Sequence, residues 1–85
     1  MIYEIEVRAS AEHDLFKLQS GILKRVDKKI RSLKNDPRPS GVLKLHGEGG
    51  WRLRVGDWRI IYDIDDRMRK VFVSRVRHRS EVYQR

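Results

Sequence analysis

The chain has 85 residues, of which 20 are Lys or Arg and 12 are Asp or Glu, so its formal net charge is +8. This length favours one domain, residues 1–85, with a single core, and excludes a second lobe or a deep active-site cleft. The sequence has no cysteine, no signal-peptide pattern at its start and no apolar run of transmembrane length, which excludes disulfide and thiolate chemistry and predicts a cytoplasmic protein without a membrane partner.

The first part of the chain predicts a strand and two helices. Residues 3–8 alternate between apolar and charged side chains, as in a half-buried strand. Ser10 is a candidate N-cap for a short helix, and Ser20 with Gly21 separates that helix from a longer one. Apolar residues recur at helical spacing along the second helix: Leu23, Val26, Ile30 and Leu33. The two helices are predicted to form a hairpin, whose exposed lysines are by default an ordinary solvated surface.

The rest of the chain predicts strands. Residues 38–50 are rich in Gly and Pro and predict a loop that leads into an edge strand at residues 42–45. Residues 51–64 alternate on both sides of a two-residue turn at residues 56–57, which predicts a β-hairpin, and residues 71–76 form the last strand. The order β-α-α-β-β-β predicts an α+β fold, in which an antiparallel twisted sheet carries the two helices on one face.

The predicted hairpin separates an apolar face from a basic one. One face contains only apolar and aromatic side chains: Trp51, Leu53, Val55, Trp58, Ile60 and Tyr62. Alternation places Arg52, Arg54 and Arg59 on the other face, with Arg54 directly opposite Arg59. Opposed like charges destabilise a sheet by up to about 1 kcal/mol, and such local conflicts tend to mark a functional surface. The alternative is that nearby acids such as Asp63 neutralise the arginines.

Positive charge increases toward the C-terminus. Residues 1–50 contain ten basic and seven acidic residues, whereas residues 51–85 contain ten and five, and nine of those last ten cations are arginines. The planar fork of arginine suits bidentate phosphate contacts and stacking on bases, so the bias favours nucleic acid as a partner. A solvated basic surface, or one that binds acidic proteins or membranes, is the alternative.

The last strand and the tail add further candidate residues. Which of Arg75, Arg77 and Arg79 reaches the face of Arg59 depends on a one-residue register choice that the sequence leaves open. His78 titrates near neutrality when it is unperturbed, although a solvated histidine without a chemical role is the alternative. Tyr83 can stack on a base or exchange a proton.

Three stretches together resemble a known family. Residues 51–62 read Trp-Arg-Leu-Arg-Val-Gly-Asp-Trp-Arg-Ile-Ile-Tyr, residues 36–39 read Asp-Pro-Arg-Pro ahead of Leu-Lys-Leu-His-Gly at 43–47, and residues 77–83 read Arg-His-Arg-Ser-Glu-Val-Tyr. In this order they resemble the central hairpin, the loop and the tail of the RelE-like branch of the RelE/ParE toxin superfamily. The resemblance covers nearly the whole chain and implies the RelE-like microbial RNase fold.

The resemblance also implies a function. RelE-like toxins of type II toxin-antitoxin systems cleave mRNA in the ribosomal A site, with the substrate's own 2′-hydroxyl as nucleophile and without a metal or cofactor. It therefore implies three partners, namely the ribosome, mRNA and a cognate antitoxin. The residues that match the family's catalytic positions are Arg52, Arg54, Arg59, Arg77 and Tyr83. We add His78 as a further catalytic candidate, and Lys44, Arg75 and Arg79 as RNA-binding candidates.

One departure from the family concerns proton transfer. In the best-known RelE-type members the two first-strand positions are lysines, one of which can act as a base. Arginine, with a pKa above ~12, almost never gives up its proton, so Arg52 and Arg54 would orient and neutralise the phosphate only. Proton transfer would then fall to Tyr83 or His78, and the sequence leaves open which is the general base.

Two other functions are compatible with the sequence. A ParE-like toxin of the same fold poisons DNA gyrase and is not a nuclease, although such members usually lack so complete a cluster of tail residues. A catalytically decayed RNA-binding module is the other alternative. The leading expectation is the ribosome-dependent endoribonuclease, because that function accounts for Arg54, Arg59, Arg77 and Tyr83 together.

Overall fold

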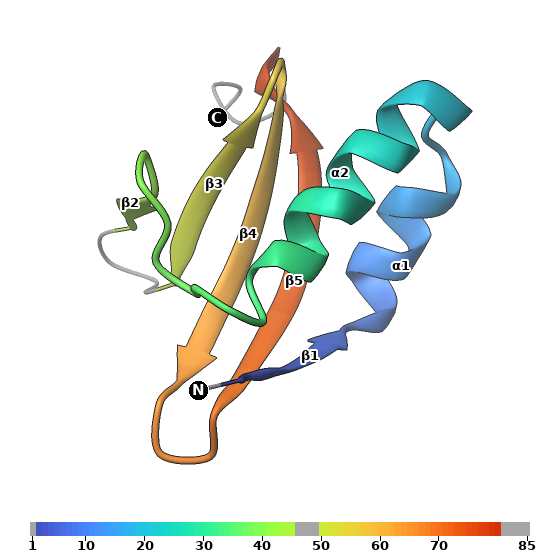
Figure 1. The fold of residues 1–85 in the computed structure, drawn as a ribbon. Coiled ribbons are helices and arrows are strands. Elements are labelled where there is room, and N and C mark those ends of the chain that lie inside the picture. Colours follow the sequence, from blue (N-terminus) through green and yellow to red (C-terminus); the bar gives the residue numbers. More distant parts are fainter. Residues whose placement is uncertain (1, 46–49, 81–85) are drawn as a thin grey trace.

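The computed structural model describes residues 2–45 and 50–80 and shows a five-stranded sheet with two helices (Figure 1). The elements follow one another as β1 (Glu4–Val7), α1 (Ala9–Phe16), α2 (Ser20–Ser32), β2 (Leu43–Lys44), β3 (Trp51–Val55), β4 (Trp58–Asp65) and β5 (Lys70–His78). The predicted α+β class is confirmed. The edge strand predicted at residues 42–45 forms as β2, with two residues, and makes five strands in place of the four in the expected order β-α-α-β-β-β.

The strand order in the sheet is β1-β5-β4-β3-β2, so β1 and β2 lie at the edges. The sheet is mixed, and the prediction of an antiparallel sheet is wrong for one pair: β1 runs parallel to β5, with Ile5 opposite Val71 and Val7 opposite Val73. Parallel neighbours require a long crossover connection, which the helices and the other strands supply here. Alternation in a strand is the same in both directions, so the sequence pattern could not distinguish them.

The core lies between the sheet and the helices. Val26, Ile30 and Leu33 of the second helix region are buried against Leu53 and Ile60 of the sheet. The apolar stripe of α2 therefore covers the apolar face of the β3–β4 hairpin, as the two sequence periods predict. None of the helices in the described part of the chain is long and apolar enough to cross a membrane.

The start of α1 differs from the expectation. Its N-cap position is Arg8, and no side chain caps the helix there. Ser10 lies inside the helix, and its hydroxyl donates a 2.7 Å hydrogen bond to the carbonyl of Ser74 in β5. Ser74 has no ladder partner in β4, because the ladder shifts register between the pairs Ile61–Arg75 and Tyr62–Val73, although its hydroxyl donates a 3.1 Å hydrogen bond to the carbonyl of Ile61. The hydroxyl of Ser10 therefore satisfies a carbonyl at a β-bulge, which a local capping rule does not foresee.

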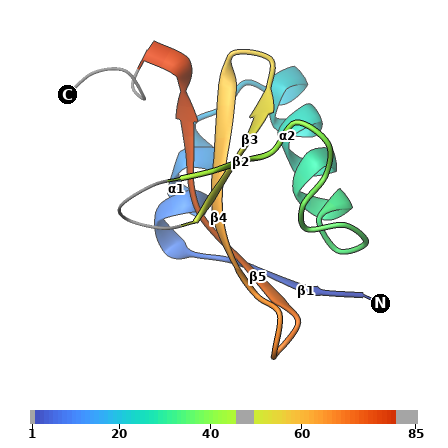
Figure 2. The same ribbon diagram turned by 90° about the vertical axis from the view of Figure 1, so that its left-hand side faces the viewer.

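The hairpin turn positions the basic face. Gly56 has a φ of 60°, the sign that the first central position of a type II′ turn requires. The pairs Val55–Trp58, Arg54–Arg59 and Leu53–Ile60 follow from this two-residue turn and confirm the predicted register. The turn between β4 and β5 lies at the opposite end of the sheet from this one (Figure 2). The C-terminal end of β5 therefore lies beside the β3–β4 turn.

Candidate functional site

Three arginines form a row across the three central strands of the sheet, β3, β4 and β5. Arg59 of β4 is opposite Arg54 of β3 on one side and opposite Arg77 of β5 on the other. Residues directly opposite in a ladder share a face, so all three lie on the face that the helices do not cover. The register of the last strand, which the sequence left open, thus brings Arg77 to the row. We call these three residues together with Arg52 the arginine face.

A small depression lies on the arginine face. It has a volume of about 160 Å³ and is lined by Gly41, Leu43, Arg52, Arg54 and Arg59. Leu43 is opposite Arg52 in the ladder, and its side chain is 53% exposed. Drug-sized ligands usually occupy pockets of about 300–1,000 Å³, so this depression can hold one anionic group rather than a whole nucleotide.

Burial differs sharply along the arginine row. Arg59 is 1% exposed, whereas Arg54 is exposed and Arg77 is half-buried. Within the described residues, the one hydrogen bond that the Arg59 guanidinium makes goes to the carbonyl of Trp58, at 3.3 Å. A guanidinium held in a poorly solvated place attracts an anion more strongly than one in bulk water.

Within residues 2–45 and 50–80, no Asp or Glu forms an ion pair with the arginines of the β3–β4 hairpin. None of the ion pairs in that part of the chain involves Arg52, Arg54 or Arg59. Asp63, the predicted alternative partner, is exposed and lies opposite Phe72 near the other end of β4. The positive charge of the hairpin is therefore available to an anionic ligand.

Arg75 differs from the arginines of the hairpin, because it forms an ion pair with Asp14 of α1. Its Nε donates to Oδ2 of Asp14 at 2.9 Å, its Nη2 donates to Oδ1 at 3.2 Å, and the amide of Val76 also donates to Oδ2 at 2.9 Å. Partial burial of Asp14 raises the pKa of its carboxyl, but the hydrogen bonds from Arg75 and Val76 outweigh that effect and lower the pKa. Arg75 thus joins β5 to α1. The sequence pattern raised only the question of which arginine reaches the face of Arg59, and it did not predict this ion pair.

His78 lies on the other face of the sheet from the arginine row. It is opposite Trp58, and the two rings meet edge to face with centroids 5.1 Å apart. Trp58 shares the helix-side face with Val55 and Ile60, so His78 does too. Its Nδ1 accepts a 3.2 Å hydrogen bond from the amide of Ser80. The structure therefore does not bring this catalytic candidate to the arginine face.

Three more predicted residues lie at the margins of the site or beyond the described chain. Lys44 of β2 is opposite Trp51, with its Nζ 5.6 Å from the ring centroid, which places it on the helix-side face. Arg79 is exposed, and its Nη1 lies 3.9 Å from Oδ1 of Asp57. Tyr83 lies outside the described residues, so its catalytic role stays a prediction.

Sequence reasoning missed two residues that line the depression. Gly41 and Leu43 belong to the loop and to β2, where the sequence predicted an edge strand but no functional contact. The signal was present, because residues 42–45 form a short apolar island next to a basic hairpin. An exposed leucine beside arginines that form no ion pair within the described residues is suited to contact the apolar part of an anionic ligand.

Comparisons with known proteins agree on one family. Residues 5–83 match the family model of the ParE toxin of type II toxin-antitoxin systems, parDE. Toxin RelG of Mycobacterium tuberculosis is 33% identical over 87 residues, and the match covers 100% of both chains. A chain of the crystal structure of the toxin-antitoxin complex RelBE2 from M. tuberculosis is 32% identical with a TM-score of 0.82, over 93% of this chain and 100% of that one. The isolated Escherichia coli RelE toxin is 28% identical with a TM-score of 0.77, over 95% and 90%.

Proposed function

The chain belongs to the ParE toxin family of type II toxin-antitoxin systems, within the RelE/ParE superfamily, and from this premise we propose that it is a ribosome-dependent endoribonuclease. It cleaves mRNA in the A site by attack of the 2′-hydroxyl on the adjacent phosphate, which forms a 2′,3′-cyclic phosphate and breaks the P–O5′ bond. The 5′-oxygen leaves as a hydroxyl once it is protonated, the mRNA is cut, and translation is thereby inhibited. The observation that carries this proposal is the row Arg54–Arg59–Arg77 with no acid paired to the hairpin arginines in the described chain.

The arginine face suits the charge that develops during such cleavage. Attack on the phosphate produces a pentacoordinate species with more negative charge on its oxygens than the starting phosphodiester has. Cations held in place before the reaction stabilise that charge without reorganising. Arg59, buried and flanked by two further arginines, supplies the central positive charge, and Arg52 and Arg54 at the rim of the depression orient the phosphate.

The size of the depression supports dependence on the ribosome. A volume of about 160 Å³ is too small to enclose a nucleotide, so this depression by itself does not fix an RNA strand. A second surface is needed to fix the strand, and the ribosomal A site supplies one. Position and orientation, rather than a deep pocket, then account for most of the rate.

Proton transfer falls to the tail in this proposal. Arginine is a poor base, so none of the four residues of the arginine face can accept the 2′-hydroxyl proton readily. His78 is turned to the helix side of the sheet, which leaves Tyr83 as the candidate to move a proton. The proposal therefore treats Arg52, Arg54, Arg59 and Arg77 as phosphate ligands and Tyr83 as the general acid or base.

Partners follow from the toxin assignment. The similar RelBE2 structure is a toxin-antitoxin complex. By analogy, a cognate antitoxin neutralises this chain in its host, and the cytoplasm is where both would act. An antitoxin segment of acidic, amphipathic character would suit a toxin with a net charge of +8.

The family match also supports a second function, a toxin that poisons DNA gyrase and cleaves no RNA. Expression of the chain in bacteria without an antitoxin separates the two. Arrest of protein synthesis with new mRNA ends inside reading frames supports the endoribonuclease. DNA damage with translation intact would support the gyrase poison, and growth without any defect would support a decayed module.

A further inference from the structure

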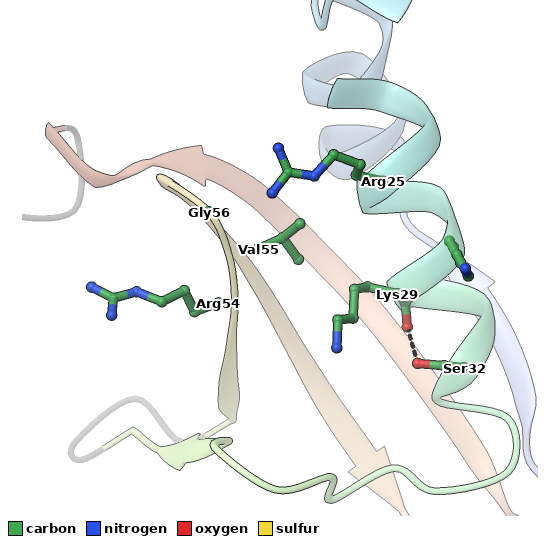
Figure 3. A pocket seen from close by; sticks show the side chains of 7 residues that line it. Arg25, Lys29, Ser32, Arg54, Val55 and Gly56 are labelled. Carbon is green, nitrogen blue, oxygen red and sulfur yellow. Dashed lines mark hydrogen bonds between the residues drawn. The ribbon is translucent and has the colours of Figure 1, made fainter. Parts of the chain in front are cut away.

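A second basic hollow lies on the helix side of β3. It has a volume of about 440 Å³ and separates α2 from the tip of the β3–β4 hairpin (Figure 3). Its lining consists of Arg25, Lys28, Lys29, Ser32, Arg54, Val55 and Gly56. We call it the α2 groove. No acidic residue lines it, so its charge is positive throughout.

The geometry directs the cations of α2 into the groove. Arg25, Lys29 and Ser32 lie on one stripe of the helix, at the spacing of neighbouring turns. Arg25 and Lys29 extend from α2 toward β3, and Val55 points back at them as an apolar floor (Figure 3). A Cβ on Gly56 would lie 3.1 Å from Nη2 of Arg25, so the bare turn lets that guanidinium lie close to the hairpin.

These cations have no internal counter-ion. Among the described residues, no ion pair includes Arg25, Lys28 or Lys29. The same helix does pair Arg31 with Asp27, at 3.0 Å, on its solvent side. Like charges one turn apart destabilise a helix by a few tenths of a kcal/mol, about as much as opposite charges stabilise it. An anionic occupant would remove that repulsion.

Arg54 connects the α2 groove with the depression on the arginine face. It lines both hollows, and its side chain leaves β3 on the side away from α2 (Figure 3). Strand β2 pairs with β3 only at Trp51 and Arg52, so no described strand covers the edge of β3 at residues 53–55. A single polynucleotide strand can therefore pass around that edge from one hollow to the other.

We infer that the α2 groove binds the phosphodiester backbone of the same RNA strand that is cut on the arginine face. This inference rests on the proposed function and extends it, because it assigns Arg25 and Lys29 to the flanking phosphates. The strand crosses the edge of β3 at Arg54, whose side chain extends to the arginine-face side (Figure 3). RNA fits the lining better than an acidic amphipathic peptide does, because Val55 is the one apolar side chain among the described residues that line the groove.

The test compares two variants with equal loss of charge. Arg25→Gln/Lys29→Gln removes two cations from the groove, and the control Lys34→Gln/Arg67→Gln removes two exposed cations outside it. Binding of a fluorescent single-stranded RNA is measured over a salt series, and cleavage is measured on programmed ribosomes. The groove variant should bind about 10-fold more weakly at low salt, with a salt slope smaller by about 1.4, and the control should stay close to wild type.

Each outcome decides between the hypotheses. Equal losses in both variants would overturn the inference, because net charge alone would then explain binding. Unchanged RNA affinity in the groove variant, with lost affinity for a glutamate-rich peptide, would overturn it in favour of a protein partner. In both cases, cleavage of mRNA on programmed ribosomes by the wild-type protein would leave the proposed function intact. If the wild type neither bound nor cut RNA, the proposed function itself would fail.

Discussion

Arg59 is a cation that is 1% exposed and lies between two other cations in the sheet. Burial of a charge without a counter-ion is unfavourable, and opposed like charges add to that cost. Under the proposed function, ligand binding would explain why such an arrangement persists, because a bound phosphate would supply the negative charge that Arg59 lacks within the described residues. The residue is therefore expected to favour activity at the expense of stability.

A substitution that keeps the size of Arg59 and removes its charge tests this trade-off. Arg59→Met should lower mRNA cleavage on ribosomes by about 10²-fold or more, because a positioned charge at the reacting phosphate is lost. Its midpoint of thermal unfolding should equal or exceed that of the wild type. Arg67→Met, in the exposed β4–β5 turn, is the control and should change neither quantity. A folded Arg59→Met variant with full activity would remove Arg59 from the site.

The two candidates for proton transfer, Tyr83 and His78, can be tested by separate substitutions. Tyr83→Phe keeps the ring and removes the hydroxyl, so stacking on a base survives and proton transfer does not. We expect it to reduce the single-turnover rate on ribosomes by about 10²-fold. His78→Ala should be mild, because His78 contacts Trp58 on the helix side. The roles would be reversed if Tyr83→Phe kept its rate and His78→Ala abolished it.

At the scale of elements, the outer edge of the last part of β5, opposite to its pairing with β4, is held by a helix and not by a strand. Strand β1 pairs with β5 only up to Val73, and beyond it the carboxylate of Asp14 in α1 accepts the amide of Val76 and two bonds from Arg75. Asp14 is 10% exposed, so these bonds are shielded from water. The docking of α1 therefore fixes the part of β5 that carries Arg77.

Removal of this carboxylate should destabilise the fold. Asp14→Ala leaves the Val76 amide and Arg75 without their acceptor, and we expect a loss of about 2 kcal/mol in the free energy of urea unfolding at neutral pH. Asp27→Ala, which breaks the exposed pair with Arg31, is the control and should cost less than about 0.5 kcal/mol. Equal losses in the two variants would contradict the structural role of Asp14.

The same pair predicts a dependence on acid. The pKa of Asp14 is lowered in the folded protein, so the folded state binds the proton less readily than the unfolded state does. Its contribution is complete above the ordinary value of 3.8 and is lost as the pH falls through the folded value. Hydrogen bonds from Arg38 and Tyr3 lower the pKa of Asp66 to about 2, so Asp66 also contributes stability that is lost as the pH falls. The difference between wild type and Asp14→Ala should thus shrink below a pH of about 4.

Local chemistry made some elements predictable and left others open. The two-residue turn at Gly56 determines the pairing of β3 with β4, so Arg54 opposite Arg59 followed from sequence alone. The pairing of β5 depends on a bulge at Ser74, which Ser10 of α1 stabilises from another element. The direction of β1 depends on the long crossover that connects it to β5. Tertiary contacts decide such features, and a periodic pattern does not contain them.

Within the site, the sequence predicted the types of functional side chain better than it predicted where each of them lies in the fold. Residue type and alternation were enough to predict Arg52, Arg54 and Arg59 on one face. Arg75 lies on the same face as Arg77 but is paired with Asp14, and His78 contacts Trp58 on the helix side of the sheet. The α2 lysines read as an ordinary solvated surface, because only the folded hairpin gives them an opposite wall.

At the scale of the whole molecule, two basic hollows lie on the two sides of β3, and Arg54 lines both. The arginine face lies on one side of β3 and the α2 groove on the other, and both are close to the β3–β4 turn. Two shallow basic hollows that share Arg54 are suited to an RNA strand that a larger particle already holds. The central claim is therefore that the ribosome presents the substrate and the arginine face cuts it.

The most direct test of that claim is an mRNA cleavage assay with purified protein. The wild type is added to ribosomes programmed with a defined mRNA and an empty A site, and to the same mRNA without ribosomes, and the new 5′ ends are mapped. The account predicts a cut at the A-site codon on ribosomes, cleavage of free mRNA slower by about 10²-fold or more, and loss of the cut in Arg59→Met. Equal cleavage with and without ribosomes, or a cut that persists in Arg59→Met, would contradict it.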